Sequence, residues 1–597
     1  MVSALRGGLK RGIEVAEQDR SLYEKVVELA HRRGFFWPSS ELYGGVSGFL
    51  DFGPLGAAMK HRLEEKWRKW FVLRHQDFIA EIETPVVMPS KVFEASGHVQ
   101  HFTDYVVDCK SCSRKFRADH LIEEQTGLRG LEGLGSEALS KLIAEHGVRC
   151  PECGGALGEV RSFNLLFRTT IGPYTENVAF ARPEAAQGMF INFSKVYRVM
   201  REKLPLGIAQ IGKVLRNEIS PRQGPIRLRE FTIMEIELFF DPEDPTCPLL
   251  DKVREEELKL LTEEDVEKGA EPRKVKVGEA VEEGYIKTEW NAYFMALSKG
   301  FLESLGVPDD KQLFVAKLPS ERAHYAAQVY DQTVYLDRWG WVEVSGHAYR
   351  TDYDLKGHME VSGEDLRVYK RLDTPVVKHK LTFKPNVELI KKDFGSNVGG
   401  ILKEISRLRV EEISEALTRI GFIEVLGFRL TRDHFIFKEE EVKETGRRFI
   451  PHVAEPSFGA ERLVYVTLEY AYSEREGRVV LKLPKDLAPI EIVVLPLVSR
   501  DGLPEVAKRV YEELVHRGFR VEYDESGSIG RRYARVDEIG VPLAVTVDHQ
   551  TLEDNSVTVR DRDTWSQVRV KVEELPAKLR AYLDGELSFK ELGASFK

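Results

Sequence analysis

The sequence predicts an α+β protein with a large part built on antiparallel strands and a smaller C-terminal α/β domain. Strand-like segments alternate with loops from Phe163 to Phe240, and Val214–Phe240 has the pattern of a hairpin with a long connection. Strand patterning returns at Thr333–Val344. After a change of composition at Lys482–Pro489, strands alternate with helices, which is typical of a small domain with a mostly parallel sheet.

Composition limits the class of protein. The chain has 597 residues, enough for about four domains of roughly 150 residues each. Apolar residues make up 42%, yet no apolar run approaches the roughly 20 residues of a membrane-spanning helix. Five cysteines and an N-terminus without a signal-peptide pattern lead us to expect a cytoplasmic protein. The net charge of -10 excludes a uniformly basic nucleic-acid coat but not a local basic groove.

The N-terminal elements follow from periodicity. Residues 1–36 have a charged helical pattern, whereas Gly44–Gly56 is too rich in glycine for the interior of an element and predicts loops and tight turns. A helix follows, because apolar residues recur there at helical spacing: Met59, Leu63, Trp67, Trp70 and Phe71. A strand near Ile79–Glu83 ends at Thr84-Pro85, because proline lacks the N–H that a ladder needs.

Changes in charge and composition divide the chain into domains. We expect one domain from residues 1–105 and 160–485, and a C-terminal domain at 486–597. A cysteine-bearing insertion interrupts the first domain at 106–159. Two charged segments, at 241–332 and 358–446, have the pattern of further insertions, the first of them helical.

Four cysteines form two CxxC pairs with 37 residues between them: Cys109, Cys112, Cys150 and Cys153. Two such pairs supply four thiolates in a tetrahedral shell, which suits a structural zinc ion. The alternatives are four unrelated thiols or a redox pair. His98, His101 and His120 lie close in sequence, and one of them is an alternative to a sulfur ligand, but we expect each to be an ordinary surface or substrate-side histidine. We expect Cys247 to be a buried apolar residue.

The hairpin at Val214–Phe240 carries the residues that indicate chemistry. Arg216 precedes its loop, and Arg222 and Arg227 lie in the loop; arginine is the side chain for bidentate phosphate recognition. On the return strand Phe231, Ile233, Glu235 and Glu237 share one face, and the opposite face is apolar. Phe231 and Glu235 lie about 13 Å apart, a span that suits a nucleotide base at one end and a cation at the other. A solvated edge hairpin has the same pattern.

These residues resemble three motifs of class II aminoacyl-tRNA synthetases. Arg216, Glu218 and Phe231 match motif 2. The helix at 57–73 with Pro85 matches motif 1, and Gly459 with Arg462 matches motif 3. Further segments are similar to glycyl-tRNA synthetases of the dimeric archaeal and eukaryotic type: GGVSGFLDFGPLG (44–56), FRADHL (116–121), RPEAAQG (182–188), RNEISPR (216–222), YRTDYDL (349–355) and EPSFG (455–459). The resemblance covers the chain from about residue 20 to its end.

The resemblance implies a homodimer that joins glycine to tRNA(Gly) through a glycyl-adenylate, with ATP and Mg²⁺ and without a membrane. It implies that Arg216 contacts the α-phosphate and that Arg227 and Arg462 hold the β- and γ-phosphates. Phe231 would stack on adenine, and Glu218 and Glu343 would position ATP or magnesium. Arg216, Glu218 and Arg462 are the expected catalytic residues, because positioned charges carry most of such a reaction.

The resemblance also implies a pocket for glycine. Glu184, Glu235 and Glu455 would surround its ammonium group, Ser457 would lie near the α-carbon, and Arg350 would pair with the carboxylate. Three crowded carboxylates repel one another unless a cation arrives, which favours a functional reading. Exclusion of larger side chains can then provide specificity without an editing domain.

The C-terminal domain resembles the anticodon-binding domain of several class II synthetases. Its segment Ser528–Arg535, with three arginines and a tyrosine, is a candidate for tRNA contact, as are the two charged insertions. Three alternatives remain: a synthetase for another amino acid such as threonine, a synthetase-like RNA-binding or regulatory protein without catalysis, and a zinc-dependent RNA-binding module.

Overall fold

The computed structural model describes residues 21–128, 130–131, 133–221 and 223–596. The chain forms two compact units. The main unit contains the residues up to Leu366 and those from Pro451 onward, and the hairpin unit contains Arg367–Ile450. Within the described residues no helix combines the length and the apolar character that crossing a bilayer requires.

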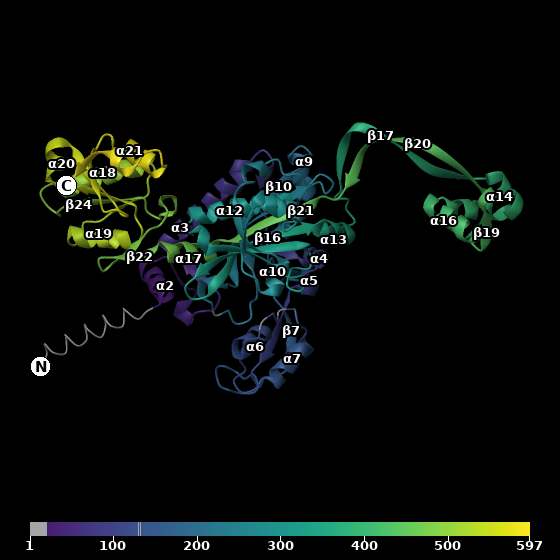
Figure 1. Ribbon diagram of the computed structural model, residues 1–597, viewed down its shortest axis with the longest axis horizontal. Helices are drawn as coiled ribbons and strands as arrows, with labels where there is room; N and C mark the ends of the chain where they lie inside the picture. The colour runs from purple at the N-terminus through teal and green to yellow at the C-terminus, as the bar shows by residue number, and fades with distance from the viewer. Residues whose placement is uncertain (1–20, 129, 132, 222, 597) are drawn as a thin grey trace. The chain divides into compact units, whose positions relative to one another are not determined.

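A nine-stranded sheet is the centre of the main unit, and Figure 1 shows its strands β10, β16 and β21. Only the pairs β12–β14 and β10–β3 are parallel, so the predicted antiparallel sheet is confirmed. The strands, in spatial order, are β13 (Arg273–Lys276), β12 (Glu257–Leu261), β14 (Gln312–Ala316), β15 (Gln328–Leu336), β16 (Gly340–Thr351), β21 (His452–Gly459), β11 (Glu230–Phe240), β10 (Leu206–Leu215) and β3 (Ile79–Glu81).

The segment 241–332 builds part of this sheet and its core, although the sequence predicted a helical insertion. It supplies β12, β13 and β14 at one end of the sheet, besides α10 (Glu263–Lys268) and α11 (Val277–Glu282). Its longest helix, α12 (Glu289–Ser304), buries Trp290, Phe294 and Phe301 in the main core. The high charge of the segment concealed short strands whose inward residues, such as Leu258 and Leu260, are apolar.

The helical pattern predicted for residues 1–36 is present in its described part, and residues 1–20 lie outside the described residues. Helix α2 (Leu22–Arg33) begins with a capping box at Ser21 and ends at Gly34, whose φ of 75° suits a residue without Cβ. Helix α3 (Pro54–Trp67) continues as a π-helical turn, Arg68–Val72. The aromatic rings of Phe71 and Phe458, on β21, lie 4.9 Å apart, so α3 is packed on the sheet.

The main unit contains further helices and strands outside the nine-stranded sheet. They are β1 (Phe36–Pro38), β2 (Leu50–Phe52), β4 (Val87–Pro89), α4 (Ser90–Ala95), α5 (His98–His101), β8 (Phe167–Thr170), β9 (Val178–Ala181), α8 (Ala186–Phe190), α9 (Phe193–Val199), α13 (Tyr353–Ser362), α17 (Ala460–Ala471), β22 (Tyr472–Arg475) and β23 (Arg478–Leu481). Helix α17 follows β21 directly, after Gly459 of the motif 3 pattern.

The cysteine-bearing segment folds around its own small core. Its three-stranded sheet has the order β6 (Lys115–Arg117), β5 (Thr103–Asp108) and β7 (Arg161–Asn164). Helices α6 (Ala118–Thr126) and α7 (Ser136–Glu145) pack on it, with Leu121, Leu139 and Val107 buried between them. We call this segment the cysteine module.

The C-terminal part has a second large core and a six-stranded sheet. Its strands, in spatial order, are β25 (Val521–Tyr523), β24 (Ile492–Pro496), β26 (Leu543–Val547), β27 (Ser556–Asp561), β28 (Gln567–Lys571) and β29 (Ala594–Phe596). The first three are parallel and the rest antiparallel, so the sheet is mixed and the expectation of a mostly parallel one was wrong. Its helices are α18 (Leu503–His516), α19 (Ile529–Glu538), α20 (His549–Asp554) and α21 (Leu575–Leu583).

The hairpin unit consists of a long two-stranded ribbon and a small helical end. Strands β17 (Val368–Pro385) and β20 (Phe435–Phe449) run side by side in Figure 1. The chain between them forms α14 (Val387–Phe394), α15 (Val398–Ile405), α16 (Val410–Ile420) and the hairpin of β18 (Phe422–Val425) and β19 (Phe428–Thr431). Ile390, Ile401 and Ile413 form a core of their own.

Candidate functional site

A cavity of about 550 Å³ opens beside strands β11, β16 and β21 of the central sheet. Three of the arginines that line it come from separate parts of the chain: Arg216 after β10, Arg227 before β11 and Arg462 in the first turn of α17. Phe231, Glu343 and Ser457 line the same space. The fold therefore brings together residues that the sequence assigned to one site.

Arg216 is held against the aromatic residue of the return strand. Its Nε donates to the carbonyl oxygen of Pro183 at 3.0 Å, and its guanidinium lies 5.3 Å from the ring centroid of Phe231. The ring of Phe102 lies 5.8 Å from the same guanidinium. This geometry leaves a cation next to a flat aromatic surface, which is what binding a base and its phosphates requires.

Arg227 belongs to a chain of charged groups that reaches the cysteine module. Its Nε donates to Glu218 Oε2 at 2.7 Å, and its guanidinium lies 3.9 Å from Asp104. Asp104 in turn lies 3.3 Å from Arg117. Burial raises the pKa of Asp104, although the guanidinium of Arg117 opposes that shift. Arg222, the other arginine predicted in this loop, lies outside the described residues.

Arg462 and Glu343 lie next to each other in the lining of the cavity. Arg462 Nε donates to the carbonyl oxygen of Ile226 at 3.0 Å, its Nη1 donates to the carbonyl oxygen of Glu343, and the Glu343 carboxylate lies 3.8 Å away. Burial, with the nearby Glu343 carboxylate, raises the pKa of Asp331 to about 7. The carboxylates of Asp331 on β15 and Glu343 on β16 are thus close to the guanidinium of Arg462.

The residues predicted to bind glycine surround a buried guanidinium. Arg350 is 0% exposed and lies between three carboxylates. Its Nε donates to Asp354 at 2.9 Å, Nη1 to Glu455 at 2.9 Å and Nη2 to Glu184 at 3.2 Å. The ring centroid of Tyr325 lies 3.7 Å from the guanidinium. Arg350 is therefore bound to carboxylates of the protein, and its predicted pairing with the carboxylate of glycine stays a prediction.

The carboxylates of this pocket differ in their electrostatics. Burial by itself would raise the pKa of Glu184, but the Arg350 guanidinium beside it holds that pKa well below the ordinary value. Burial and the neighbouring Glu455 carboxylate raise the pKa of Glu235 well above it, and the same two causes raise that of Glu237. Glu235 Oε2 accepts a hydrogen bond from the backbone N–H of Ala185 at 2.9 Å.

The β-sheet register connects this acidic pocket to the cavity. Ser457 lies opposite Glu235 across the β11–β21 pair and opposite Gly346 across the β16–β21 pair. A Cβ on Gly346 would come within 3.5 Å of the Ser457 hydroxyl. Ser457 lines the cavity, whereas Glu235 and Glu455 lie deeper. The register therefore places a small residue between the arginine-lined cavity and the acidic pocket.

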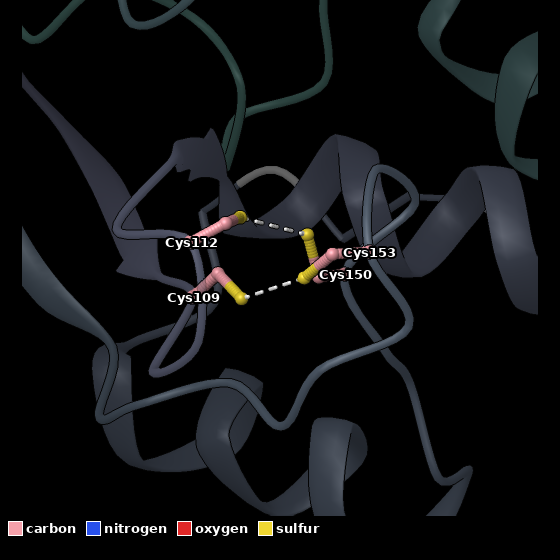
Figure 2. A group of neighbouring side chains, drawn as sticks. All are labelled: Cys109, Cys112, Cys150 and Cys153. Carbon is pink, nitrogen blue, oxygen red and sulfur yellow. Dashed lines mark hydrogen bonds between the residues drawn. The ribbon is translucent and has the colours of Figure 1, made fainter.

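The four predicted cysteine ligands converge in the cysteine module (Figure 2). Cys109 Sγ lies 3.5 Å from Cys153 Sγ, and Cys112 Sγ lies 3.7 Å from Cys150 Sγ. A tetrahedral zinc ion with Zn–S bonds of about 2.3 Å requires sulfurs about 3.8 Å apart. The backbone N–H of Ser111 also points to Cys109 Sγ, as in a metal-binding knuckle. The donor set and its spacing fit zinc without a histidine ligand.

Two cavity residues come from the cysteine module and were not assigned from the sequence. Arg117 and His120 line the cavity and also a smaller hollow of about 120 Å³ beside Pro151. The Ser220 hydroxyl of the hairpin loop donates to the carbonyl oxygen of Lys115 at 2.6 Å. The signal was the segment FRADHL, which was used to recognise the family but not to place residues in the site.

The arginine cluster of the C-terminal domain is only partly exposed. Arg532 is buried and donates to the backbone carbonyl oxygens of Pro496, Asp524 and Leu497. Arg535 pairs with Asp524. Of the three predicted RNA-contacting arginines, Arg531 alone is exposed, whereas Arg535 is half-buried. Arg532 therefore has a structural role at the start of α19. The sequence pattern did not distinguish this buried arginine from an exposed one.

Comparisons with known proteins agree with this geometry. Residues 491–582 match the family model described as "Anticodon binding domain". The chain is 53% identical to a protein named glycine–tRNA ligase from Aeropyrum pernix, over 96% of this chain and 99% of the relative. A protein of the same name from Pyrococcus horikoshii is 48% identical over 94% of this chain and 99% of its own length.

Among solved structures, one described as the RNA binding domain of threonyl-tRNA synthetase from Cryptosporidium parvum Iowa II superposes with a TM-score of 0.51. It is 17% identical and covers 93% of this chain and 98% of its own. At that identity the likeness concerns the fold alone.

Proposed function

The chain belongs to the glycine–tRNA ligase family and is a ligase that attaches glycine to tRNA, and we propose that it activates glycine with ATP in the cavity beside β11, β16 and β21. The observation that supports this site best is the acidic pocket around Arg350, separated from three cavity arginines by Ser457. Family membership confirms the predicted family and excludes the threonine alternative.

The first step joins the carboxylate oxygen of glycine to the α-phosphorus of ATP and breaks the bond from that phosphorus to pyrophosphate. We assign Arg216 to the α-phosphate, where negative charge accumulates in the transition state. Arg227 and Arg462 bind the β- and γ-phosphates that leave. Phe231 stacks on adenine, since its ring lies beside the Arg216 guanidinium.

Charge positioning completes the ATP site. Glu218 holds Arg227 through the 2.7 Å hydrogen bond, so its role is to orient that guanidinium. Glu343 and the neighbouring Asp331 are the carboxylates that would hold Mg²⁺ with the nucleotide, because oxygen ligands suit this ion. Magnesium would neutralise phosphate charge, and the arginines orient the phosphates for in-line attack.

The second step transfers the glycyl group to a hydroxyl of the terminal adenosine of tRNA and releases AMP. We assign the glycine ammonium to Glu235 and Glu455, with Glu184 and Arg350 as the frame of the pocket. Ser457 lies where a side chain on the α-carbon would point, so larger amino acids are excluded by contact. No nucleophilic side chain is required in either step.

The remaining parts bind RNA and stabilise the fold. The domain matched at 491–582 recognises the anticodon, with Arg531 as its exposed arginine. The hairpin unit contains 18 Lys and Arg against 13 Asp and Glu in a chain of net charge -10, so we assign it to the acceptor arm. Zinc in the cysteine module has a structural role. The protein acts as a cytoplasmic homodimer.

Arg216→Ala tests the assigned site. We expect loss of glycine-dependent exchange between ATP and pyrophosphate by 100-fold or more, because removal of one preorganised donor costs about 3–4 kcal/mol in the transition state. Arg517→Ala is the matched control, since Arg517 is exposed at the C-cap of α18 and pairs only with Glu513 among the described contacts. Exchange retained by folded Arg216→Ala would contradict the site and favour a synthetase-like protein that binds RNA without catalysis.

A further inference from the structure

Asp104 is a carboxylate of the cysteine module that no assigned role uses. It lies on β5, and its Oδ2 is 3.3 Å from the guanidinium of Arg117 and 3.9 Å from that of Arg227. Both arginines line the cavity. Oδ2 is buried and accepts no hydrogen bond from the described residues. Burying a carboxylate oxygen in this way is costly, so its place between two cavity arginines requires an explanation.

Arg227 is held by carboxylates from two parts of the chain. Its Nε and its Nη2 both lie 2.7 Å from Glu218 Oε2, and the same Nη2 faces Asp104. A guanidinium is a rigid fork of five donors, so contacts to Nε and Nη2 fix its orientation. Nη1 makes no contact with the described residues, which leaves it for a ligand in the cavity that Arg227 lines.

The cavity lining is rich in cations that repel one another until an anion binds. Five of its residues are arginines or lysines: Arg117, Arg216, Arg227, Arg462 and Lys317. A long cationic side chain in such surroundings turns away from its neighbours unless it is held in place. A cation that is already oriented binds a phosphate more tightly, because its ordering costs nothing when the ligand arrives. Carboxylates beside Arg227 therefore favour phosphate binding through its orientation.

The cysteine module holds Asp104 in place. Strand β5 pairs with β6 on one side and with β7 on the other, so the position of Asp104 is set by a sheet. The module also contacts the loop between β10 and β11, because the Ser220 hydroxyl donates to the carbonyl oxygen of Lys115 at 2.6 Å. Pro151, between two of the cysteines, and Pro221 of that loop line the same small hollow.

We propose that Asp104 is a positioning residue of the ATP site, which holds the guanidinium of Arg227 for the β- and γ-phosphates of the nucleotide. Asp104 touches no substrate and acts through Arg227, with Glu218 as the second carboxylate. The proposal rests on the proposed function, because that function assigns these phosphates to Arg227. It gives the cysteine module a part in nucleotide binding besides its own folding.

The proposal separates ligands that carry the β- and γ-phosphates from ligands that lack them. ATP and pyrophosphate contain the groups assigned to Arg227, whereas AMP and glycine do not. Loss of the Asp104 charge should therefore weaken the binding of the first pair and leave that of the second pair unchanged. A residue that only stabilises the fold would affect all four ligands or none.

Calorimetric titration of the full-length, zinc-loaded protein with pyrophosphate, ATP and AMP, each with Mg²⁺, measures this selectivity. In Asp104→Asn we expect the dissociation constants for pyrophosphate and ATP to rise about 5- to 30-fold, the range that one lost contact between charges produces. The dissociation constant for AMP and the KM for glycine in the exchange assay should stay within about twofold of the wild type, with equal zinc content.

Asp108→Asn is the matched control. Asp108 lies on the same face of β5, and its ion pairs are with Lys115 and Arg161, neither of which lines the cavity. We expect wild-type affinity for pyrophosphate in this variant. A rise equal to that in Asp104→Asn would show a general effect of the module and would overturn the role of Asp104.

A double-mutant cycle tests the route through Arg227. In the Arg227→Ala background, the effect of Asp104→Asn on pyrophosphate binding should fall by at least half, because the guanidinium that Asp104 positions is absent. An undiminished effect in that background would contradict the proposal.

Unchanged or tighter pyrophosphate binding in Asp104→Asn would overturn the proposal, and so would an equal loss of affinity for AMP. If the asparagine variant does not fold, Asp104→Glu keeps the charge but moves the carboxylate by one methylene, and unaltered pyrophosphate binding in that variant would equally refute the role. A wild type without glycine-dependent exchange would refute the proposed function, whereas a selective loss of pyrophosphate affinity in Asp104→Asn would still support the role of Asp104.

Discussion

Replacing Arg350 with glutamine removes a buried guanidinium from a pocket of carboxylates. Arg350 is fully buried and donates to Asp354, Glu455 and Glu184, so the variant leaves three buried carboxylates without their cation. Breaking a buried ion pair from one side costs about 3–5 kcal/mol. We expect a loss of that size in the free energy of unfolding of the main unit at pH 7.

The deficit should depend on pH in a defined direction. In the wild type the pKa of Glu184 is held well below its ordinary value of about 4.5, so this carboxylate stabilises the fold above that pH and the contribution is lost as pH falls through the folded pKa. In the variant the carboxylates take up protons more readily, which relieves the repulsion. The difference between the two proteins is therefore largest at pH 7 and shrinks toward pH 4.5.

Urea unfolding at pH 7 and at pH 5, monitored by tryptophan fluorescence, measures this difference. Arg532→Gln is the matched control: Arg532 is equally buried but donates to backbone carbonyl oxygens, so its cost should change little with pH. An Arg350→Gln deficit below about 1 kcal/mol, or one that grows as pH falls, would refute the charge balance described for the pocket.

Three further predictions concern separate parts of the chain. Phe231→Ala should raise the KM for ATP about tenfold or more, with a smaller effect on the KM for glycine, because stacking contributes about 1–3 kcal/mol per base. An unchanged KM for ATP in the exchange assay would show that adenine does not stack on Phe231. Cys150→Ser should release the metal and unfold the cysteine module, since structural zinc contributes roughly 10–16 kcal/mol; unchanged zinc content by mass spectrometry would contradict the four-thiolate site. Truncation after Ala488 keeps Leu487 in the main core and should preserve glycine activation while tRNA charging falls at least 100-fold; full charging by the truncated protein would show the anticodon domain to be dispensable.

The sequence predicted the elements that carry motifs more accurately than those that do not. The alternation of Phe231, Ile233 and Glu235 against Met234 and Ile236 correctly separated the site face of β11 from its core face. The segment 241–332 was misjudged, because its charges lie on the outer faces of elements whose short apolar runs join the sheet. Net charge describes a surface and does not determine which strands a segment contributes.

The site shows the same limit at the level of single residues. The motifs led us to expect Arg216, Arg227 and Arg462 in one site, and all three line the same cavity. It could not show that Arg350 is bound to carboxylates of the protein, or that Glu237 accepts no hydrogen bond from the described residues, because both depend on cross-strand register and burial. Arg117 and His120 reach the cavity from the cysteine module, a tertiary juxtaposition that no local pattern encodes.

The measurement that tests the account most directly is amino-acid-dependent exchange between ATP and pyrophosphate, without tRNA, for each of the twenty amino acids. The account predicts exchange with glycine alone, since it assigns the ammonium group to the acidic pocket and the exclusion of larger side chains to Ser457. Exchange with another amino acid would contradict the assigned pocket, and no exchange with any of them from folded, zinc-loaded protein would contradict the assigned cavity.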